Sequence, residues 1–232
     1  MTAAGLGLPG LDFAVLDAYW PVILAGLWTT VRLCGASILL GLAVGLGVEL
    51  LRARVRRAAP LCRVYVEFFR GSPILIQLFL LYYAGPGIGI TLDPEAAGVV
   101  GLGLYGGAYF AEIFRSGFEA IPRGQLEAAA CLGMPPLRAL LRIELPQMAA
   151  LVLPPAVNQS IILIKDSAVL SIITVPELTK QTSRIINETF TIAEPLLVLA
   201  ALYWLLVTGL SAAGAALEAR LTRHLNPSRK TS

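Results

Sequence analysis

Charged residues are scarce in this sequence of 232 residues: Asp, Glu, Lys and Arg make up 14% of it, against about 25% in an average soluble domain. Histidine is scarcer still, since the chain has one, His224, in a charged tail with no other metal ligand close in sequence. No basic face interleaved with aromatic residues stands out either. We therefore expect no metal site, no catalytic residues and no nucleic-acid partner.

Cysteine is also rare, and the three residues Cys34, Cys62 and Cys131 are widely spaced. An odd, scattered set argues against a disulfide framework and against a zinc site. The motif G-x-x-x-x-G-K-[ST] is absent, and no glycine is followed by lysine anywhere in the chain. The sequence thus has no P-loop with which to hold ATP, and we expect the chain to bind no cofactor.

Positive charge is missing from residues 1–17, which carry Asp12 and Asp17 but no Lys or Arg. A secretory signal peptide begins with a positively charged stretch. We therefore expect no cleavable signal peptide and a first membrane span that stays in the protein.

Apolar residues are abundant, at 56% of the chain with a mean hydropathy of +0.74. This predicts an all-α membrane protein with room for five or six spans of about 20 residues each, forming one transmembrane domain over residues 1–232. A weakly apolar stretch, residues 167–191, is expected to form a re-entrant or surface helix. The five expected spans cover about residues 20–50, 64–84, 96–114, 148–164 and 195–214.

Positive charges give the expected orientation, because cytoplasmic segments are enriched in Lys and Arg. Two loops and the C-terminal tail are rich in them, whereas the segments assigned to the exterior hold three. Five spans with the N-terminus outside and the C-terminus in the cytoplasm fit this distribution. The cytoplasmic set is Arg52, Arg54, Arg56, Arg57, Arg63, Arg115, Arg123, Arg138, Arg142, Arg220, Arg223, Arg229 and Lys230, and the exterior set is Lys165, Lys180 and Arg184.

Two acid–base pairs stand at the ends of spans. Glu67 and Arg70 lie one helical turn apart just before Gly71-Ser72-Pro73, which should break the helix, and Glu112 and Arg115 have the same spacing. The pairs are interpreted either as structural ion pairs near the cytoplasmic surface or as parts of a gate.

The fourth span carries polar residues where few are expected. Pro154-Pro155 should interrupt the helix and leave carbonyls in need of partners, and Asn158 and Gln159 follow on the next turn. Lys165 and Asp166 come next, and ionisable residues within a span usually pair or face a cavity. Two readings stay open for Lys165 and Asp166: they border a translocation pathway, or they form a structural pair at the outer end.

Residues 123–146 form a polar segment between hydrophobic spans. Gly133, Pro135 and Pro136 predict a short helix, a bend and a second short helix, because proline is tolerated in the first turn of a helix but not in its interior. Ala128 to Ala130 leave a nearly bare backbone, as a docking helix requires. Helical periodicity fits equally well an amphipathic helix on the membrane surface.

The spacing within this segment resembles the EAA loop of ABC importer permeases. Glu127-Ala128-Ala129 is followed after three residues by Gly133, and after nine more by Ile143-x-Leu145-Pro146. Further motifs narrow the resemblance to the polar amino-acid branch, the histidine/arginine/glutamine-type family, over about residues 20–215. These motifs are Gly26-Leu27-Trp28-Thr29-Thr30, Tyr65-x-Glu67-Phe68-Phe69-Arg70-Gly71-Ser72-Pro73-x-x-x-Gln77, Tyr109-Phe110-Ala111-Glu112-Ile113-Phe114-Arg115-Ser116-Gly117, Ile121-Pro122-Arg123-Gly124-Gln125, Asn158 and Lys165-Asp166-Ser167.

The sequence departs from the family pattern at two places. Met134-Pro135-Pro136 stands where the family usually has Ser or Thr and an aromatic residue, and Ser167-Ala168-Val169 stands where it often has Thr-Ser-Leu. The first difference affects the fit to the ATPase, and the second affects any transfer of substrate contacts.

The resemblance implies a MetI-like type I importer permease in the bacterial cytoplasmic (inner) membrane. The expected partners are an ABC ATPase dimer that carries ATP and magnesium, a second permease subunit (a homodimer or a sister heterodimer), an extracytoplasmic solute-binding protein, membrane lipid and a polar amino acid. Gly124, Gln125, Glu127, Ala128, Ala129 and Gly133 are expected to couple to the ATPase.

Asn158, Gln159, Lys165 and Asp166 are expected to line the substrate pathway, with Lys165 for a carboxylate and Asp166 for an ammonium group. The alternative function is an ion-coupled secondary amino-acid transporter, for which broken helices and intramembrane acid and base residues are also expected.

Overall fold

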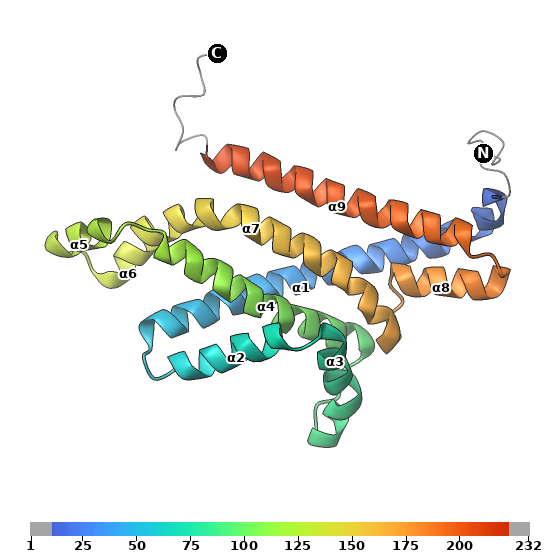
Figure 1. Ribbon diagram of the computed structural model, residues 1–232, viewed down its shortest axis with the longest axis horizontal. Helices are drawn as coiled ribbons and strands as arrows, with labels where there is room; N and C mark the ends of the chain where they lie inside the picture. Colours follow the sequence, from blue (N-terminus) through green and yellow to red (C-terminus); the bar gives the residue numbers. More distant parts are fainter. Residues whose placement is uncertain (1–10, 223–232) are drawn as a thin grey trace, which may run out of the picture.

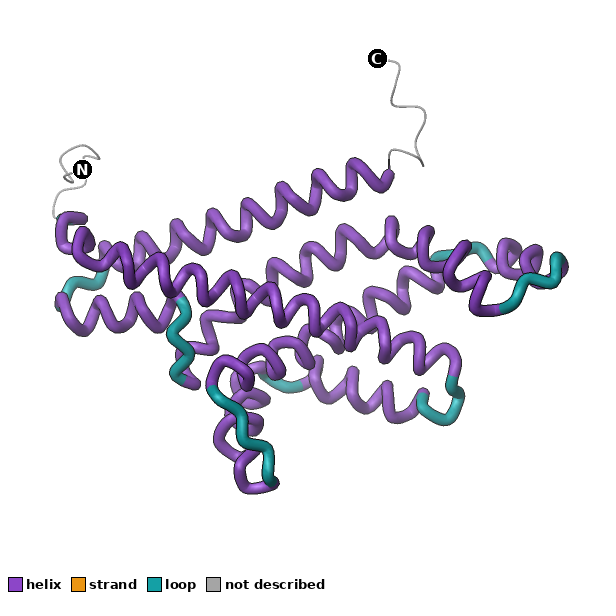
Figure 2. The backbone as a smooth tube through the Cα atoms, turned by 180° about the vertical axis from the view of Figure 1, so that it is seen from behind, coloured by secondary structure: helices purple, strands orange, loops and turns teal. Residues whose placement is uncertain are grey.

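The computed structural model describes residues 11–222, and every regular element in that range is helical (Figures 1 and 2). Arg223, His224, Arg229 and Lys230 lie outside the described residues. In chain order the elements are η2 (Phe13–Tyr19), α1 (Trp20–Arg54), α2 (Ala59–Gly71), α3 (Ile74–Phe79), η3 (Leu80–Ala84), η4 (Gly85–Ile88), α4 (Pro94–Glu119), α5 (Arg123–Cys131), α6 (Pro136–Ala139), η5 (Leu140–Glu144), α7 (Leu145–Asp166), η6 (Ser167–Ile173), α8 (Leu178–Thr189) and α9 (Ala193–Thr222).

Four helical stretches within the described residues are long and apolar enough to cross a membrane. A fifth span results if α2 and the helix from Ile74 to Ile88 are counted as one, bent by 108° at the break between them. Ser72 is extended because the residue before a proline avoids the helical conformation. The five expected spans and the break at 71–73 are therefore confirmed.

Small residues let α1 and α4 pack closely, and this is the most extensive helix pair in the molecule. A Cβ atom at Gly45 would lie 2.6 Å from Cβ of Phe110 and 2.9 Å from the backbone nitrogen of Ala111, and one at Gly103 would lie 2.5 Å from a methyl group of Leu40. Glycine at these positions brings the two backbones together.

The expected interruption at Pro154-Pro155 is wrong, because α7 runs without a break from Leu145 to Asp166. The two prolines each remove one backbone donor, so the carbonyls of Ala150 and Leu151 lose their usual helical partners. The turns of α7 before and after the two prolines keep the helix continuous.

The helix–bend–helix pattern predicted for residues 123–146 is confirmed. Helix α5 ends where Gly133 adopts a left-handed conformation with φ of 68°. The Met134 amide donates to the Ala129 carbonyl at 3.0 Å and the Gly133 amide donates to the Ala130 carbonyl at 2.9 Å, which is the Schellman pattern of helix termination. Pro136 then occupies the first turn of α6.

Residues 167–191 form η6 and α8, which lies at the opposite end of the bundle from α5 (Figure 1). Helix α8 packs on α1 and α9 and buries Leu178, Thr182 and Ile185. Its N-terminus is capped by Glu177, whose carboxylate accepts hydrogen bonds from the amides of Thr179 and Lys180.

Candidate functional site: a charged cavity and the adjoining surface segment

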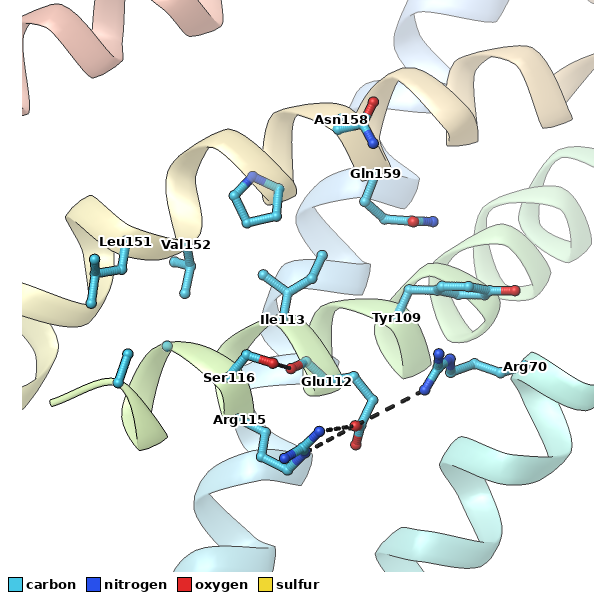
Figure 3. A pocket seen from close by; sticks show the side chains of 13 residues that line it. Arg70, Tyr109, Glu112, Ile113, Arg115, Ser116, Leu151, Val152, Asn158 and Gln159 are labelled. Atoms are coloured by element: carbon cyan, nitrogen blue, oxygen red, sulfur yellow. Dashed lines mark hydrogen bonds and ion pairs between the residues drawn. The ribbon is translucent and has the colours of Figure 1, made fainter.

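A cavity of about 630 Å³ opens between α2, α4 and α7 (Figure 3). Charged and polar side chains come from α2 and α4 on one side, and amide side chains come from α7 on the other. Its lining is Arg70, Tyr109, Glu112, Ile113, Arg115, Ser116, Gly117, Ala120, Leu151, Val152, Pro155, Asn158 and Gln159.

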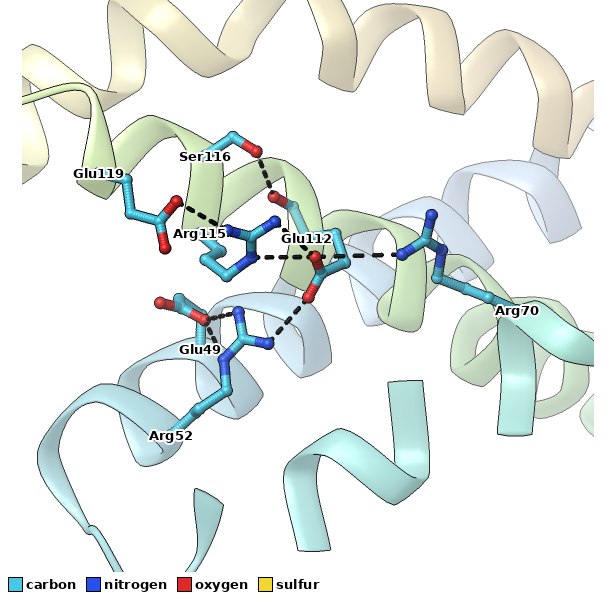
Figure 4. A network of polar contacts seen from close by, with 7 residues as sticks. All are labelled: Glu49, Arg52, Arg70, Glu112, Arg115, Ser116 and Glu119. Carbon is cyan, nitrogen blue, oxygen red and sulfur yellow. Dashed lines mark hydrogen bonds and ion pairs between the residues drawn. The ribbon is translucent and has the colours of Figure 1, made fainter. Parts of the chain in front are cut away.

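Glu112, in the wall of this cavity, is the centre of an ion-pair network (Figure 4). One of its oxygens accepts from Arg52 Nη1 of α1 at 2.8 Å, and the other accepts from Arg115 Nε at 2.9 Å. Arg52 also binds Glu49, one turn earlier on α1, with 2.8 Å between Nε and Oε2. Arg115 reaches Glu119 at 2.7 Å. The network thus joins α1 to α4.

Arg70 is bound more loosely than the other two arginines. Its Nη1 lies 4.0 Å from Glu112 Oε2, and its guanidinium carbon lies 5.3 Å from the centre of the Tyr109 ring, within the range of a cation–π contact. The expected pair of Glu67 with Arg70 is wrong: among the described residues Glu67 forms no ion pair, because Arg70 turns toward α4. The expected pair of Glu112 with Arg115 is confirmed.

Asn158 and Gln159 both line the cavity (Figure 3). The Gln159 amide nitrogen is buried, and it has no hydrogen-bond partner in the described part of the chain. A buried donor without a partner costs about 1–3 kcal/mol. This donor is therefore available to a molecule that enters the cavity.

Lys165 and Asp166 do not line the same cavity. They stand at the end of α7, about 10 Å beyond Asn158 at the helical rise of 1.5 Å per residue. Lys165 is exposed and Asp166 is half-buried. The structure thus brings two of the four expected pathway residues together and leaves the other two further along the helix.

Tyr109, Ser116 and Arg52 take part in this site but were not among the residues expected from the sequence. Tyr109 and Ser116 belong to a polar stripe at helical spacing on α4, which also includes Tyr105 and Glu112. The Tyr105 and Tyr109 hydroxyl groups lie 3.3 Å apart. Such a stripe in a glycine-rich span is a sequence signal that could have identified them.

The adjoining segment, α5 and α6, lies at the left end of the molecule in Figure 1. Gly124, Glu127, Ala128 and Gly133 are exposed there, and Leu132 is 83% exposed. Ala129, in contrast, is buried.

The Gln125 side chain is turned toward α7 and accepts a hydrogen bond from Gln147 Nε2 at 2.6 Å. The residues expected as one coupling set thus differ in their surroundings: Ala129 is buried, and Gln125, although exposed, is hydrogen-bonded to α7.

Comparison with known proteins gives consistent matches. Residues 37–223 match the family described as binding-protein-dependent transport system inner membrane component. The L-cystine transport system permease protein TcyB of Bacillus subtilis (strain 168) is 34% identical over 216 residues, which are 91% of each chain. The arginine transport system permease protein ArtQ of the same organism is 33% identical over 213 residues, covering 91% of this chain and 97% of that protein.

Solved structures give the same result. A chain from the crystal structure of an amino-acid ABC transporter with histidines matches with a TM-score of 0.83 at 32% identity, covering 90% of this chain and 99% of that chain. A chain of the inward-facing MetNI methionine ABC transporter matches with a TM-score of 0.77, covering 89% of this chain and 99% of that chain. Because the identity is 21%, this match supports the fold alone.

Proposed function

The chain belongs to the family of binding-protein-dependent transport system inner membrane components, and from this premise we propose how its cavity and its surface segment serve the import of a polar amino acid. The fold is that of type I ABC importer permeases, and the protein is a multi-pass protein of the bacterial inner membrane. It is the permease subunit of an amino-acid ABC importer. The alternative of an ion-coupled secondary transporter finds no support.

The α5 end of the bundle faces the cytoplasm in this proposal, with the N-terminus outside. The segments from Arg52 to Arg63 and from Arg115 to Arg142 carry nine positive charges at this end. The opposite end, with η6 and α8, carries Lys165, Lys180 and Arg184. Cytoplasmic loops of membrane proteins are enriched in Lys and Arg.

The exposed residues of α5 form the contact with the ATPase subunit. Glu127 supplies a charge that fixes register, Gly124 and Ala128 allow close approach, and Gly133 ends the helix in the conformation that only glycine adopts without strain. Leu132 and Leu137, which are 83% and 66% exposed, offer apolar surface to be covered by the partner.

The cavity between α2, α4 and α7 is the solute pathway, and the unpaired Gln159 donor is the observation that carries this assignment. Arg70 is suited to bind the α-carboxylate of an amino acid, because its existing contact to Glu112 is 4.0 Å long. Glu112 and the face of the Tyr109 ring suit the ammonium group. Lys165 and Asp166 border the pathway nearer its extracytoplasmic end.

Transport then depends on partners. A binding protein delivers the amino acid to the extracytoplasmic side, and a second permease subunit, identical or a sister chain, completes the pathway. ATP and magnesium are held by the ATPase dimer, since this chain has no P-loop. Closure of that dimer pulls on residues 124–132 and tilts the spans from inward-open to outward-open.

The test is reconstitution of the transporter in proteoliposomes with its ATPase, second permease and binding protein, using L-arginine, L-glutamine and L-cystine as solutes. Glu127→Lys should reduce captured ATPase by about ten-fold or more, because a reversed charge in an interface costs several kcal/mol and about 1.4 kcal/mol is already ten-fold. Glu188→Lys, the same charge change on α8, should retain it. Capture of equal amounts of ATPase by both variants would refute the contact assigned to α5.

The pathway assignment is tested in the same vesicles. Gln159→Leu should keep the ATPase but lower uptake by about ten-fold, since it removes one buried hydrogen bond to the solute. Lys165→Gln should have a smaller effect. If Lys165→Gln abolishes uptake and Gln159→Leu does not, the solute site lies at the end of α7 instead.

A further inference from the structure

We propose that Gln147 is a positioning residue that transmits movement of α5 to α7, and so to the wall of the cavity. This inference rests on the proposed function of α5 as the ATPase contact. It concerns a residue outside the expected coupling set, and it assigns a path by which that contact reaches the solute.

Helix α5 is attached to the bundle at few points. Of its nine residues, all of which are described, only Ala129 is buried. The chain connects α5 directly to α4 through Ala120–Pro122. On the other side it must pass through the Gly133 bend, α6 and the wide helical turn η5 before it reaches α7. A pull on α5 therefore reaches α4 through Ala120–Pro122, whereas it reaches α7 along the chain only across the bend at Gly133, after which α6, η5 and α7 continue as one helical stretch.

Gln147 provides a shorter route to α7. Its Nε2 donates to Gln125 Oε1 of α5 at 2.6 Å and to the carbonyl of Ile143 at 3.1 Å. The second bond fixes which end of the amide is the donor, because a carbonyl only accepts. One side chain thus joins the coupling helix to the last turn before α7, and Gln147 itself stands in the first turn of α7.

The position of Gln147 on α7 places it in line with the cavity wall. Residues 147, 151, 155 and 158 follow one another in steps of four, four and three, so they share one face of a helix. Leu151, Pro155 and Asn158 all line the cavity. A displacement at Gln147 would therefore move the face of α7 that contacts the solute.

The two helices that frame the cavity would then be driven together. Helix α4 follows α5 through the chain, and α7 follows it through the hydrogen bond from Gln147 to Gln125. Without that bond α7 would follow α5 only through the Gly133 bend, so it would lag behind α4 and ATP would be hydrolysed with less solute movement.

The test measures solute imported per ATP hydrolysed in proteoliposomes holding the whole transporter with its binding protein. The probe is whichever of L-arginine, L-glutamine and L-cystine the wild type imports. Gln147→Ala should keep the ATPase bound and keep hydrolysis within about two-fold of wild type, while the ratio falls about five-fold or more, as for a typical coupling free energy. An unchanged ratio overturns the proposal.

Gln125→Ala is the second variant, since its site is exposed and its loss does not affect the packing of α7. It should lower the ratio as Gln147→Ala does, and the double variant should be no worse than either single one, because both remove the same interaction. Gln125→Glu keeps an acceptor and should retain the wild-type ratio. Additive losses, or a loss in Gln125→Glu equal to that in Gln125→Ala, would count against the proposal.

Glu144→Gln is the matched control. Glu144 lies in η5 beside Ile143 but binds Arg54 of α1, with 3.3 Å between Nη2 and Oε1, and among the described residues it forms no hydrogen bond or ion pair with α5. Its ratio should stay at the wild-type value.

Failure of the proposed function would look different from failure of this inference, because Glu127→Lys loses the ATPase whereas Gln147→Ala keeps it. If Gln147→Ala also releases the ATPase, Gln147 serves docking and the transmission proposal is wrong.

Discussion

At the α5 end of the bundle the inner carboxylates of Glu49 and Glu112 are held by arginines, whereas at the α8 end the buried carboxylate of Glu177 is held by neutral donors. Glu112 contacts Arg52, Arg115 and, more distantly, Arg70. Glu177 accepts from the amides of Thr179 and Lys180 and from the Tyr203 hydroxyl of α9 at 3.2 Å. Among the described residues it has no ion-pair partner.

The difference concerns how easily each arrangement can change. Guanidinium groups on long side chains can exchange one carboxylate for another, and Arg70 is already 43% exposed. The backbone amides that hold Glu177 are fixed at the start of α8 and cannot turn away. Thr30 of α1 adds a further fixed bond, since its hydroxyl oxygen accepts from the Leu178 amide at 3.0 Å.

The α8 end thus ties α1, α8 and α9 into a frame, because Glu177 and Thr30 bind groups on all three helices. The α5 end joins α1, α2 and α4 through contacts that can be rearranged. The two ends should therefore respond differently to mutation and to pH.

The largest effect is expected for Arg52→Ala. This change leaves Glu49 and Glu112 without their shared cation, and Glu49 is only 5% exposed. Removing one partner of a buried ion pair costs about 3 kcal/mol or more. We expect the free energy of unfolding in mixed micelles to fall by about 3 kcal/mol.

The same substitution at the other end is the control for Arg52→Ala. Arg184 binds Glu188 one turn away on the exposed side of α8, and Arg184→Ala should give no measurable change because exposed pairs are screened by water and salt. Equal losses for Arg52→Ala and Arg184→Ala would remove the distinction between the two ends.

A second prediction concerns pH at the α8 end. Burial raises the pKa of the Glu177 carboxyl above its ordinary value of 4.5, against the lowering effect of its amide and hydroxyl donors. The folded state then holds the proton more tightly than the unfolded chain. The contribution of this group to stability is therefore complete below pH 4.5 and is lost as the pH rises through the raised folded value.

Glu177→Gln removes this titration, so its unfolding midpoint should depend less steeply on pH than that of the wild type between pH 4.5 and neutrality. The slopes are compared rather than the midpoints, since glutamine caps α8 less well. High salt screens the exposed Arg184–Glu188 pair and should leave the difference in slope unchanged. Parallel curves for the two proteins would show that Glu177 does not titrate in this range.

Features that depend on the local backbone conformation of a few residues were predicted correctly from the sequence. The break at Gly71-Ser72-Pro73 and the end of α5 at Gly133 follow from backbone chemistry at those residues. These features need no knowledge of which helices become neighbours.

Features that depend on neighbouring helices were not predicted. Periodicity indicates which residues share a face but not what lies opposite, so the burial of Ala129 and the hydrogen bond of Gln125 to α7 could not be predicted.

The smallest effect is expected for Glu67→Gln, and it tests the clearest of these differences. Sequence spacing pairs Glu67 with Arg70, and such a helical pair is worth about 0.2–0.5 kcal/mol. In the folded chain Arg70 instead faces Tyr109 and Glu112 across the interface between α2 and α4. Glu67→Gln should therefore change the free energy of unfolding by less than about 0.5 kcal/mol and leave solute uptake at the wild-type rate.

Arg70→Gln, the matched change on the other member of the sequence pair, should lower uptake because it empties the cavity wall of its exchangeable cation. Both variants are compared for uptake in the same vesicles. If Glu67→Gln lowers uptake as much as Arg70→Gln does, the two residues act as a pair during transport, and the loose contact of Arg70 with Glu112 is not the one that the solute replaces.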